Sequence, residues 1–134
     1  MPSLPIRSLH HIAVATRNAD ICKAFYIEVL GFRELPRPPF AFRGAWLYNY
    51  GFQIHVIEYA DSAPSLGRAI DSHDDHLAFA VTDIEEAKAS LTERAIAFRE
   101  RVNAGGTHQL FFHDPDGHTI ELAMYGDPAK GYRQ

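Results

Sequence analysis

"HIAVATRNADICKAFYIE", residues 11–28, aligns without a gap on "HLAFAVTDIEEAKASLTE", residues 76–93. The offset is 65 residues, and the identical positions are His, Ala, Ala, Lys, Ala and Glu. In each copy an apolar, strand-like run is followed by a segment with apolar residues at helical spacing. Asn18 or Asp20 in the first copy and Asp83 in the second are candidate helix N-caps. The stretch therefore predicts a strand followed by a helix, twice in one chain.

A second repeated segment lies at the other end of each copy. "GFQIHVIEY", residues 51–59, aligns on "GHTIELAMY", residues 117–125, with Gly, Ile and Tyr at the same places and an offset of 66. Chance similarity would not keep almost the same offset at both ends. Between the two segments, turn residues separate further strand-like runs. The sequence predicts two tandem βαβββ modules and an α+β fold.

The length and composition of the chain fit one domain over residues 1–134. We expect module one at about 8–60, a linker at 61–74, module two at about 75–126 and a C-terminal tail at 127–134. The formal charge of −4 gives no electrostatic reason to expect nucleic acid or an anionic membrane as partner.

The hydrophobic runs and the cysteine count also indicate the cellular compartment. No apolar run approaches the roughly 18 to 20 residues that span a bilayer, and the first residues do not resemble a secretory signal. Cys22 is the only cysteine, which excludes an internal disulfide and fits a reducing compartment. Its place on a predicted helix favours a small packing residue over a nucleophile. We therefore expect a cytoplasmic protein.

The strand at residues 51–59 carries two candidate metal ligands, His55 and Glu58. They are three residues apart, so on a strand they point to opposite faces. The repeat aligns His55 with Glu121, whereas Glu58 aligns with Met124 and shares its face with apolar residues. His55 is therefore the favoured ligand, and Glu58 either supports a ligand residue from behind or is an alternative ligand.

The first strand of each module begins with a histidine, His11 or His76, whose face continues with alanines. With His55 and Glu121 on the last strands, three imidazoles and one carboxylate occupy equivalent positions in two modules. Such a set suits a divalent first-row transition metal and leaves coordination positions open. The other histidines, taken singly, are expected to be hydrogen-bonded residues without a metal.

The motifs "LHHIAVAT", "FYIEVLGF", "DHLAFAV" and above all "FFHDPDGHTIEL" resemble those of the vicinal oxygen chelate superfamily over residues 8–126. This superfamily includes glyoxalase I, bleomycin- and fosfomycin-resistance proteins and extradiol dioxygenases. The resemblance implies a cupped mixed sheet with the helices on its outer face. It also implies a metal held by the residues that match the family ligands, which are His11, His55, His76 and Glu121. Zn, Ni, Mn, Co and Fe(II) are all possible metals.

The resemblance further implies a homodimer in which each site draws one module from each chain, and a small-molecule substrate. The chain is most similar to small glyoxalase I-like members. We therefore expect a metal-dependent lyase or isomerase, like lactoylglutathione lyase, that chelates adjacent substrate oxygens. Glu121 is the candidate catalytic base, moving a proton on a small carbonyl substrate.

Two alternatives stay open. The first is an extradiol-type dioxygenase with Fe(II) on His11, His76 and Glu121, in which His55 would be a surplus ligand. The second is a fosfomycin- or bleomycin-type resistance protein, acting as a transferase or as a drug-binding protein. A phosphonate would need cations, and the sequence does not show whether any of the candidate arginines points inward. These arginines are Arg37, Arg43, Arg99 and Arg101.

Departures from glyoxalase I weigh against a glutathione adduct as substrate, and nearby aromatic residues suit an aromatic or aliphatic one, while the use of glutathione stays open. Glyoxalase I enzymes have a carboxylate where His55 stands and an arginine at the position of Ala15, and their Asn-Trp stretch is replaced here by "VIEYAD". Aromatic side chains lie in or beside the Pro-rich loop at 37–44, which is a candidate lid. The candidate substrate-binding residues are Phe40, Phe42 and Trp46, although Trp46 equally suits core packing.

Overall fold

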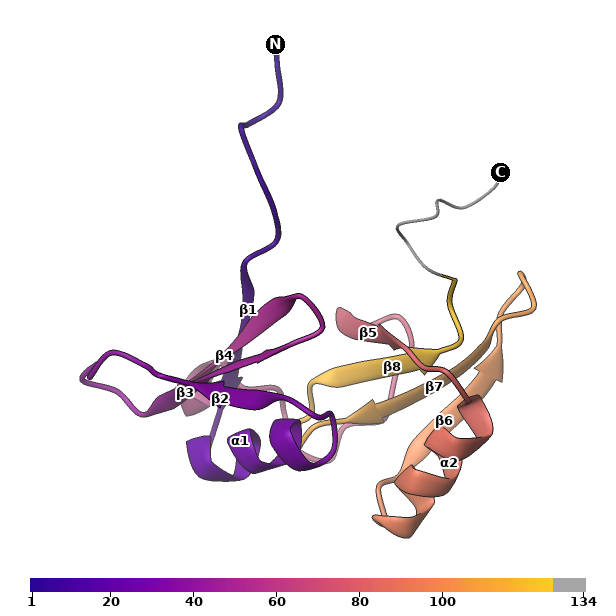
Figure 1. Ribbon diagram of the computed structural model, residues 1–134. Helices are drawn as coiled ribbons and strands as arrows, with labels where there is room; N and C mark the ends of the chain where they lie inside the picture. The colour runs from indigo at the N-terminus through magenta and orange to yellow at the C-terminus, as the bar shows by residue number, and fades with distance from the viewer. Residues whose placement is uncertain (127–134) are drawn as a thin grey trace. The chain divides into compact units, whose positions relative to one another are not determined.

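The computed structural model describes residues 1–126, so the predicted C-terminal tail at 127–134 lies outside the described residues. The chain divides into two compact units with the boundary between Pro64 and Ser65 (Figure 1). Each unit contains one complete βαβββ module, which confirms the predicted α+β class and the two-module repeat. The grouping of both modules into one domain stays a prediction.

The elements of module one follow the predicted order. They are β1 (His11–Thr16), α1 (Ala19–Glu28), β2 (Arg33–Leu35), β3 (Gly44–Asn49) and β4 (Phe52–Glu58), followed by the short 3₁₀ helix η1 (Ala60–Ser62). The elements of module two are β5 (His76–Ala80), α2 (Ile84–Glu93), β6 (Phe98–Val102), β7 (His108–His113) and β8 (Thr119–Ala123).

Each module forms a four-stranded mixed sheet with the same topology. The strand order is β1-β4-β3-β2 in module one and β5-β8-β7-β6 in module two. The first and last strands of each module pair in parallel, and the other pairs are antiparallel. The parallel pairing places the N-terminal strand, which begins with a histidine, directly beside the strand that carries His55 or Glu121.

Equivalent caps start the two helices. The Asn18 side chain accepts hydrogen bonds from the backbone N–H groups of Asp20 and Ile21, both at 3.1 Å. Asp83 caps α2 in the same way, from Glu85 and Glu86. A side-chain oxygen here satisfies N–H groups that have no partner within the helix. Asn18, rather than Asp20, is therefore the N-cap of α1.

Each sheet buries one face beneath its helix. In module one the fully buried side chains include Cys22 and Tyr26 of α1 and Leu47, Ile54 and Val56 of the sheet. Burying a large apolar side chain stabilises a fold by roughly 1.5–3 kcal/mol, so these contacts fix the helix on the sheet. Cys22 is 0% exposed, which confirms the prediction of a packing residue.

Module two has the same core with different side chains. Ile84 and Leu91 of α2 are buried, as are Leu110, Phe112 and Ile120 of the sheet. Because strand residues alternate, the opposite face of each sheet carries the predicted ligands. None of the helices in residues 1–126 has the length and apolar character needed to cross a membrane.

The "DPDG" segment sets the start of β8. Asp114 Oδ1 accepts hydrogen bonds from the backbone N–H groups of Asp116, at 2.9 Å, and His118, at 3.0 Å. Gly117 follows with φ of 93°, a left-handed conformation that glycine adopts without strain. This tight turn fixes the β7–β8 register and, with it, the position of Glu121 opposite Phe111.

Candidate metal-binding site

The two ligand candidates of module one lie against each other. The imidazole rings of His11 and His55 are stacked, with centroids 3.9 Å apart and an interplanar angle of 10°. Ala13 is the direct partner of His55 in the β1–β4 ladder, so His11 lies diagonally across from His55 on the same face. A third imidazole lies beside this pair, because Nδ1 of His10 is 2.8 Å from Nδ1 of His11.

The surroundings of His55 favour a neutral imidazole. Its Nε2 donates a hydrogen bond to Gln53 Oε1 at 2.8 Å, which leaves a lone pair on Nδ1. Burial lowers the pKa of His55 below its ordinary value, and the nearby His11, His10 and Arg37 lower it further. A neutral imidazole is the form that binds metals.

A row of aromatic rings extends from this histidine pair. Trp46 stacks on His55 with centroids 4.6 Å apart, and Phe40 lies 6.0 Å from Trp46. Phe42 stacks on Phe40 at 5.4 Å, and the Arg37 guanidinium lies over both phenylalanine rings. Phe40 and Phe42 are each 45% exposed. The three candidate substrate-binding residues thus form a partly open apolar surface that begins at His55.

In module two, His76 and Glu121 face each other. Nε2 of His76 lies 4.0 Å from Oε2 of Glu121. Nδ1 of His76 lies 2.6 Å from the backbone carbonyl oxygen of Asp74, and since a carbonyl oxygen only accepts, Nδ1 carries the hydrogen. The lone pair is therefore on Nε2, the nitrogen nearest the carboxylate.

The Glu121 carboxylate is buried, at 3% exposed, and held from both sides. Gln109 donates a hydrogen bond from Nε2 to Oε1, and the Tyr125 hydroxyl donates to Oε2 at 3.1 Å. Gln109 Nε2 also lies 3.1 Å from the Tyr125 hydroxyl oxygen. Sequence reasoning missed both residues, although Tyr125 was visible as one of the identities of the repeat.

The segment before β5 is attached to module two by Arg68. Its guanidinium bonds to the Asp74 carboxylate through Nη1, and Nη2 donates to the Gly117 carbonyl at 2.5 Å. The Thr119 hydroxyl donates to the same Asp74 carboxylate at 3.3 Å. Asp74 in turn orients His76, so Arg68 acts on the candidate ligand through an intermediate residue. No local sequence pattern signals this role.

Glu58 lies on the helix side of its sheet. Its Oε2 accepts a hydrogen bond from the backbone N–H of Ala19, at 2.9 Å, and lies 3.7 Å from Arg43 Nε. Arg43 also bonds to Asp20, at 2.6 Å. The carboxylate therefore serves the N-terminus of α1, where negative charge is favoured by the helix dipole.

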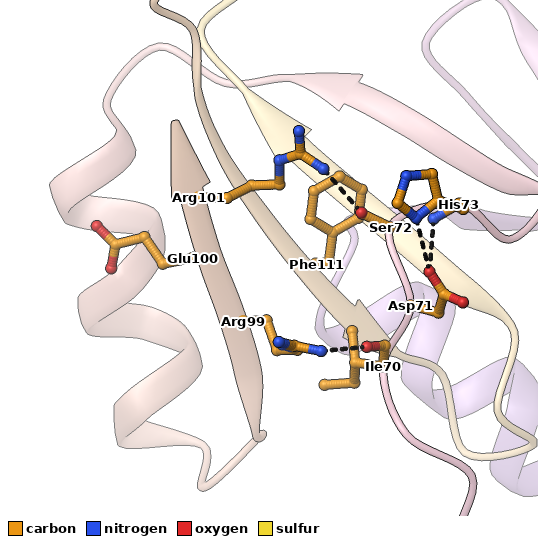
Figure 2. Close-up of a pocket in the computed structure, with 8 residues that line it drawn as sticks. All are labelled: Ile70, Asp71, Ser72, His73, Arg99, Glu100, Arg101 and Phe111. Atoms are coloured by element: carbon orange, nitrogen blue, oxygen red, sulfur yellow. Dashed lines mark hydrogen bonds and ion pairs between the residues drawn. The ribbon is translucent and has the colours of Figure 1, made fainter. Parts of the chain in front are cut away.

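Two of the candidate arginines lie on the ligand face of module two. Arg99 is the ladder partner of Phe111, and Phe111 is the partner of Glu121, so all three side chains project from the same face. Arg101, two residues along β6, shares that face. Both arginines line a pocket of about 250 Å³ beside Phe111 (Figure 2).

The expectation for the remaining histidines holds only in part. His73 bonds to Asp71, and His108 bonds to Glu100. Nε2 of His113 is buried and has no hydrogen-bond partner among the described residues, and burial lowers the pKa of this histidine. In residues 1–126, no group of three or more His, Cys, Asp or Glu side chains has a metal-binding arrangement. The predicted ligands lie close to each other as pairs, one pair within each module.

A family model described as the glyoxalase/bleomycin resistance protein/dioxygenase superfamily matches residues 8–122. The chain belongs to this superfamily. The match spans both modules and includes all four predicted ligands, which confirms the family inferred from the sequence motifs.

Similar proteins agree with this membership. "Glyoxylase I 4" of Arabidopsis thaliana is 38% identical to this glyoxalase-superfamily chain over 125 residues, covering 89% of the chain and 71% of the relative. The glyoxalase family protein from Enterococcus faecalis has a TM-score of 0.68 at 34% identity, covering 90% of this chain and 99% of that one. Lactoylglutathione lyase from Agrobacterium tumefaciens, at 17% identity, shares the fold with a TM-score of 0.68, covering 90% and 95%.

Proposed function

We propose that the protein is a metal-dependent enzyme of glyoxalase I-like type, a lyase or isomerase that moves a proton on a small carbonyl substrate. The observation that carries the proposal is the arrangement of His76 and Glu121. The Asp74 carbonyl fixes the tautomer of His76, so that the Nε2 lone pair lies 4.0 Å from a buried carboxylate oxygen. Metal-binding histidines commonly donate their other N–H group to such a carbonyl.

The donor set fits a divalent transition metal. Two ligands at about 2.1 Å from one ion lie at most about 4.2 Å apart, so the His76–Glu121 separation allows both to bind the same ion. His11 and His55 would supply the other two donors, and the lowered pKa of His55 keeps it neutral. A bound divalent metal supplies electrophilic stabilisation of negative charge on adjacent substrate oxygens.

The residues around the pair define the remaining roles. Glu121 takes a proton from the carbon next to the substrate carbonyl and returns it to the neighbouring carbon. Gln109 and Tyr125 hold the carboxylate in place during both transfers. The surface formed by Trp46, Phe40 and Phe42 binds the apolar part of the substrate and excludes water from it.

Metal titration of chelator-treated protein tests the binding step. We expect about one divalent ion per chain, measured by calorimetry and elemental analysis with Zn, Ni, Mn, Co and Fe(II). His76→Ala and Glu121→Gln should abolish tight binding. His108→Ala is the matched control, because it removes an imidazole of module two that bonds to Glu100 instead. If the wild-type protein binds none of these metals, the proposal is refuted.

Proton transfer is tested in deuterated water. The reconstituted protein should exchange the proton next to the carbonyl of small hydroxycarbonyl substrates, and Glu121→Gln should lower the exchange rate by at least about 100-fold. Methylglyoxal with glutathione and a set of catechols separate the glyoxalase and dioxygenase alternatives. If catechol rings are cleaved and no proton exchange occurs, the dioxygenase alternative replaces the lyase or isomerase assignment.

A further inference from the structure

We propose that the pocket beside Phe111 binds an anionic group of the substrate, a carboxylate or a phosphonate, through Arg99 and Arg101. This inference rests on the proposed function, because it names the substrate class that the same ligand face would accept. The pocket of about 250 Å³ is formed by β6, β7 and the segment at 70–73, all within the second compact unit of the chain. It is large enough for one small acidic group and a few neighbouring atoms.

Strand register places the two cations. Arg99 lies opposite Phe111, and Arg101 lies opposite Gln109, the residue that bonds to Glu121. Each arginine is thus separated from the predicted ligand strand β8 only by β7. In Figure 2 both guanidinium groups lie on the same side of β6 as Phe111.

Each guanidinium group is oriented by one hydrogen bond to the segment at 70–73. Arg99 Nη1 donates to the Ile70 carbonyl at 3.0 Å, and Arg101 Nη1 donates to the Ser72 hydroxyl at 2.9 Å. A guanidinium has five N–H donors, so one such bond leaves most of them available. Planar, pre-oriented guanidinium groups are well suited to bind carboxylate or phosphonate oxygens through two bonds at once.

The charge inside the pocket favours an anion. The Glu100 side chain points away toward α2 in Figure 2, where it pairs with Lys88 at 3.0 Å. Asp71 is the only carboxylate in the view that stays near the cations, and it accepts hydrogen bonds from the backbone and ring of His73. Of the two carboxylates that line the pocket, Glu100 is therefore paired with Lys88, and Asp71 already accepts hydrogen bonds from His73.

Phe111 connects the pocket to the candidate metal ligands. Its ring meets the His76 ring edge-on, with centroids 5.6 Å apart, and it also lines the pocket. A substrate whose acidic group enters the pocket would pass over Phe111 toward His76 and Glu121. The two arginines would then select substrates that carry a negative charge a short distance from the reacting carbonyl.

The test uses benzylphosphonate as the probe and benzyl alcohol as its neutral counterpart, with the chelator-treated full chain. Calorimetry should show binding of benzylphosphonate that weakens about ten- to hundredfold in Arg99→Gln and in Arg101→Gln. The Nε–Hε signals of both arginines should shift in ¹⁵N NMR spectra of the wild-type protein. Arg94→Gln is the matched control, since Arg94 contacts Ser90 at the end of α2 and does not line the pocket.

Two further variants sharpen the result. Asp71→Asn removes the opposing charge and should tighten binding about two- to tenfold. Arg99→Lys keeps the charge without the planar donors, and its affinity should lie between those of the wild type and Arg99→Gln. A thermal melt of each variant confirms that it is folded.

The proposal is overturned if benzyl alcohol binds as tightly as benzylphosphonate, if neither arginine variant weakens binding, or if the wild-type protein does not bind the probe. None of these results depends on a metal. Conversely, Arg99→Gln should bind divalent metals like the wild type. A failed metal titration therefore overturns the proposed function alone, and failed anion binding overturns this inference alone.

Discussion

Glu58 and His55 lie three residues apart on β4, and their side chains have different tasks. The Glu58 carboxylate accepts a hydrogen bond from Ala19 N at the start of α1, whereas His55 stacks between His11 and Trp46. The physical cause is the alternation of side chains along a strand. One residue therefore supports the helix, and the other lies on the ligand face.

We predict that Glu58→Ala lowers the free energy of unfolding by about 1 kcal/mol, because an N–H group at the helix start loses its acceptor. Chemical denaturation measures this loss, and the metal affinity should not change. His55→Ala should show the opposite profile, with metal affinity lowered by more than about tenfold. Met124→Ala, at the equivalent position of the repeat, is the control for Glu58. Equal losses of metal affinity in the Glu58 and His55 variants would contradict this assignment.

The titration of His55 predicts how stability depends on pH. Burial and neighbouring positive groups lower its folded-state pKa below the ordinary 6.5. Below about pH 6.5 the unfolded chain therefore takes up a proton that the folded chain does not, so stability falls as pH decreases toward the folded-state pKa. Above about pH 6.5 this contribution is fully present.

Denaturation of metal-free protein between about pH 7.5 and about pH 5 tests this sign. The wild type should lose stability across the interval, and His55→Phe should lose less because one of the titrating groups is gone. His113 acts in the same direction, since burial also lowers its pKa. A His55→Phe variant that loses as much stability as the wild type would show that His55 is not responsible.

At the scale of elements, the segment between the modules positions a candidate ligand. Arg68 holds the Asp74 carboxylate and the Gly117 carbonyl, and the Asp74 carbonyl holds His76. The ring of His76 is therefore oriented by a chain of contacts that starts eight residues earlier in the sequence. Side chains that orient metal ligands in this way commonly change metal affinity by 10- to 100-fold.

We predict that Arg68→Met lowers metal affinity by roughly tenfold or more, because the Asp74 carbonyl is no longer fixed. Amide hydrogen exchange should become faster at residues 74–76, which would not follow from a general loss of stability. Arg17→Met is the matched control, since Arg17 bonds to the Pro64 carbonyl within the first compact unit. Unchanged metal affinity together with unchanged local exchange would show that Arg68 does not position His76.

At the scale of the whole molecule, the predicted ligands form two pairs, and each pair lies within one module. His11 and His55 belong to module one, and His76 and Glu121 belong to module two. We propose a homodimer in which module one of one chain and module two of the other share a metal. Light scattering should give the mass of two chains.

Mixing two inactive variants tests the shared site. We predict that a His11→Ala/His55→Ala chain and a His76→Ala/Glu121→Gln chain each bind no metal alone. After they are unfolded and refolded together, the mixed dimer should regain one site, because one combination of modules keeps all four ligands. Metal titration and activity measure the recovery. No recovery in a mixed dimer would mean that each site forms within one chain.

Local rules explain why much of the candidate site was predictable. Strand alternation and the internal repeat selected His55 over Glu58 as the side chain on the ligand face, and helix-capping preferences marked Asn18 and Asp83. Arg99, Arg101 and Tyr125 could not be placed in this way. Their positions depend on strand register and on a side-chain bond to Glu121, both of which join residues far apart in the sequence.

The sequence by itself determined the repeated βαβββ order, the superfamily and which residues are ligand candidates, because these follow from periodicity and motifs within short segments. Only the tertiary structure decided that Glu121 is held by Gln109 and Tyr125, that the Asp74 carbonyl orients His76, and that two arginines share the face of Glu121. The physical reason is that hydrogen bonds and strand registers between distant segments form only when the whole module packs.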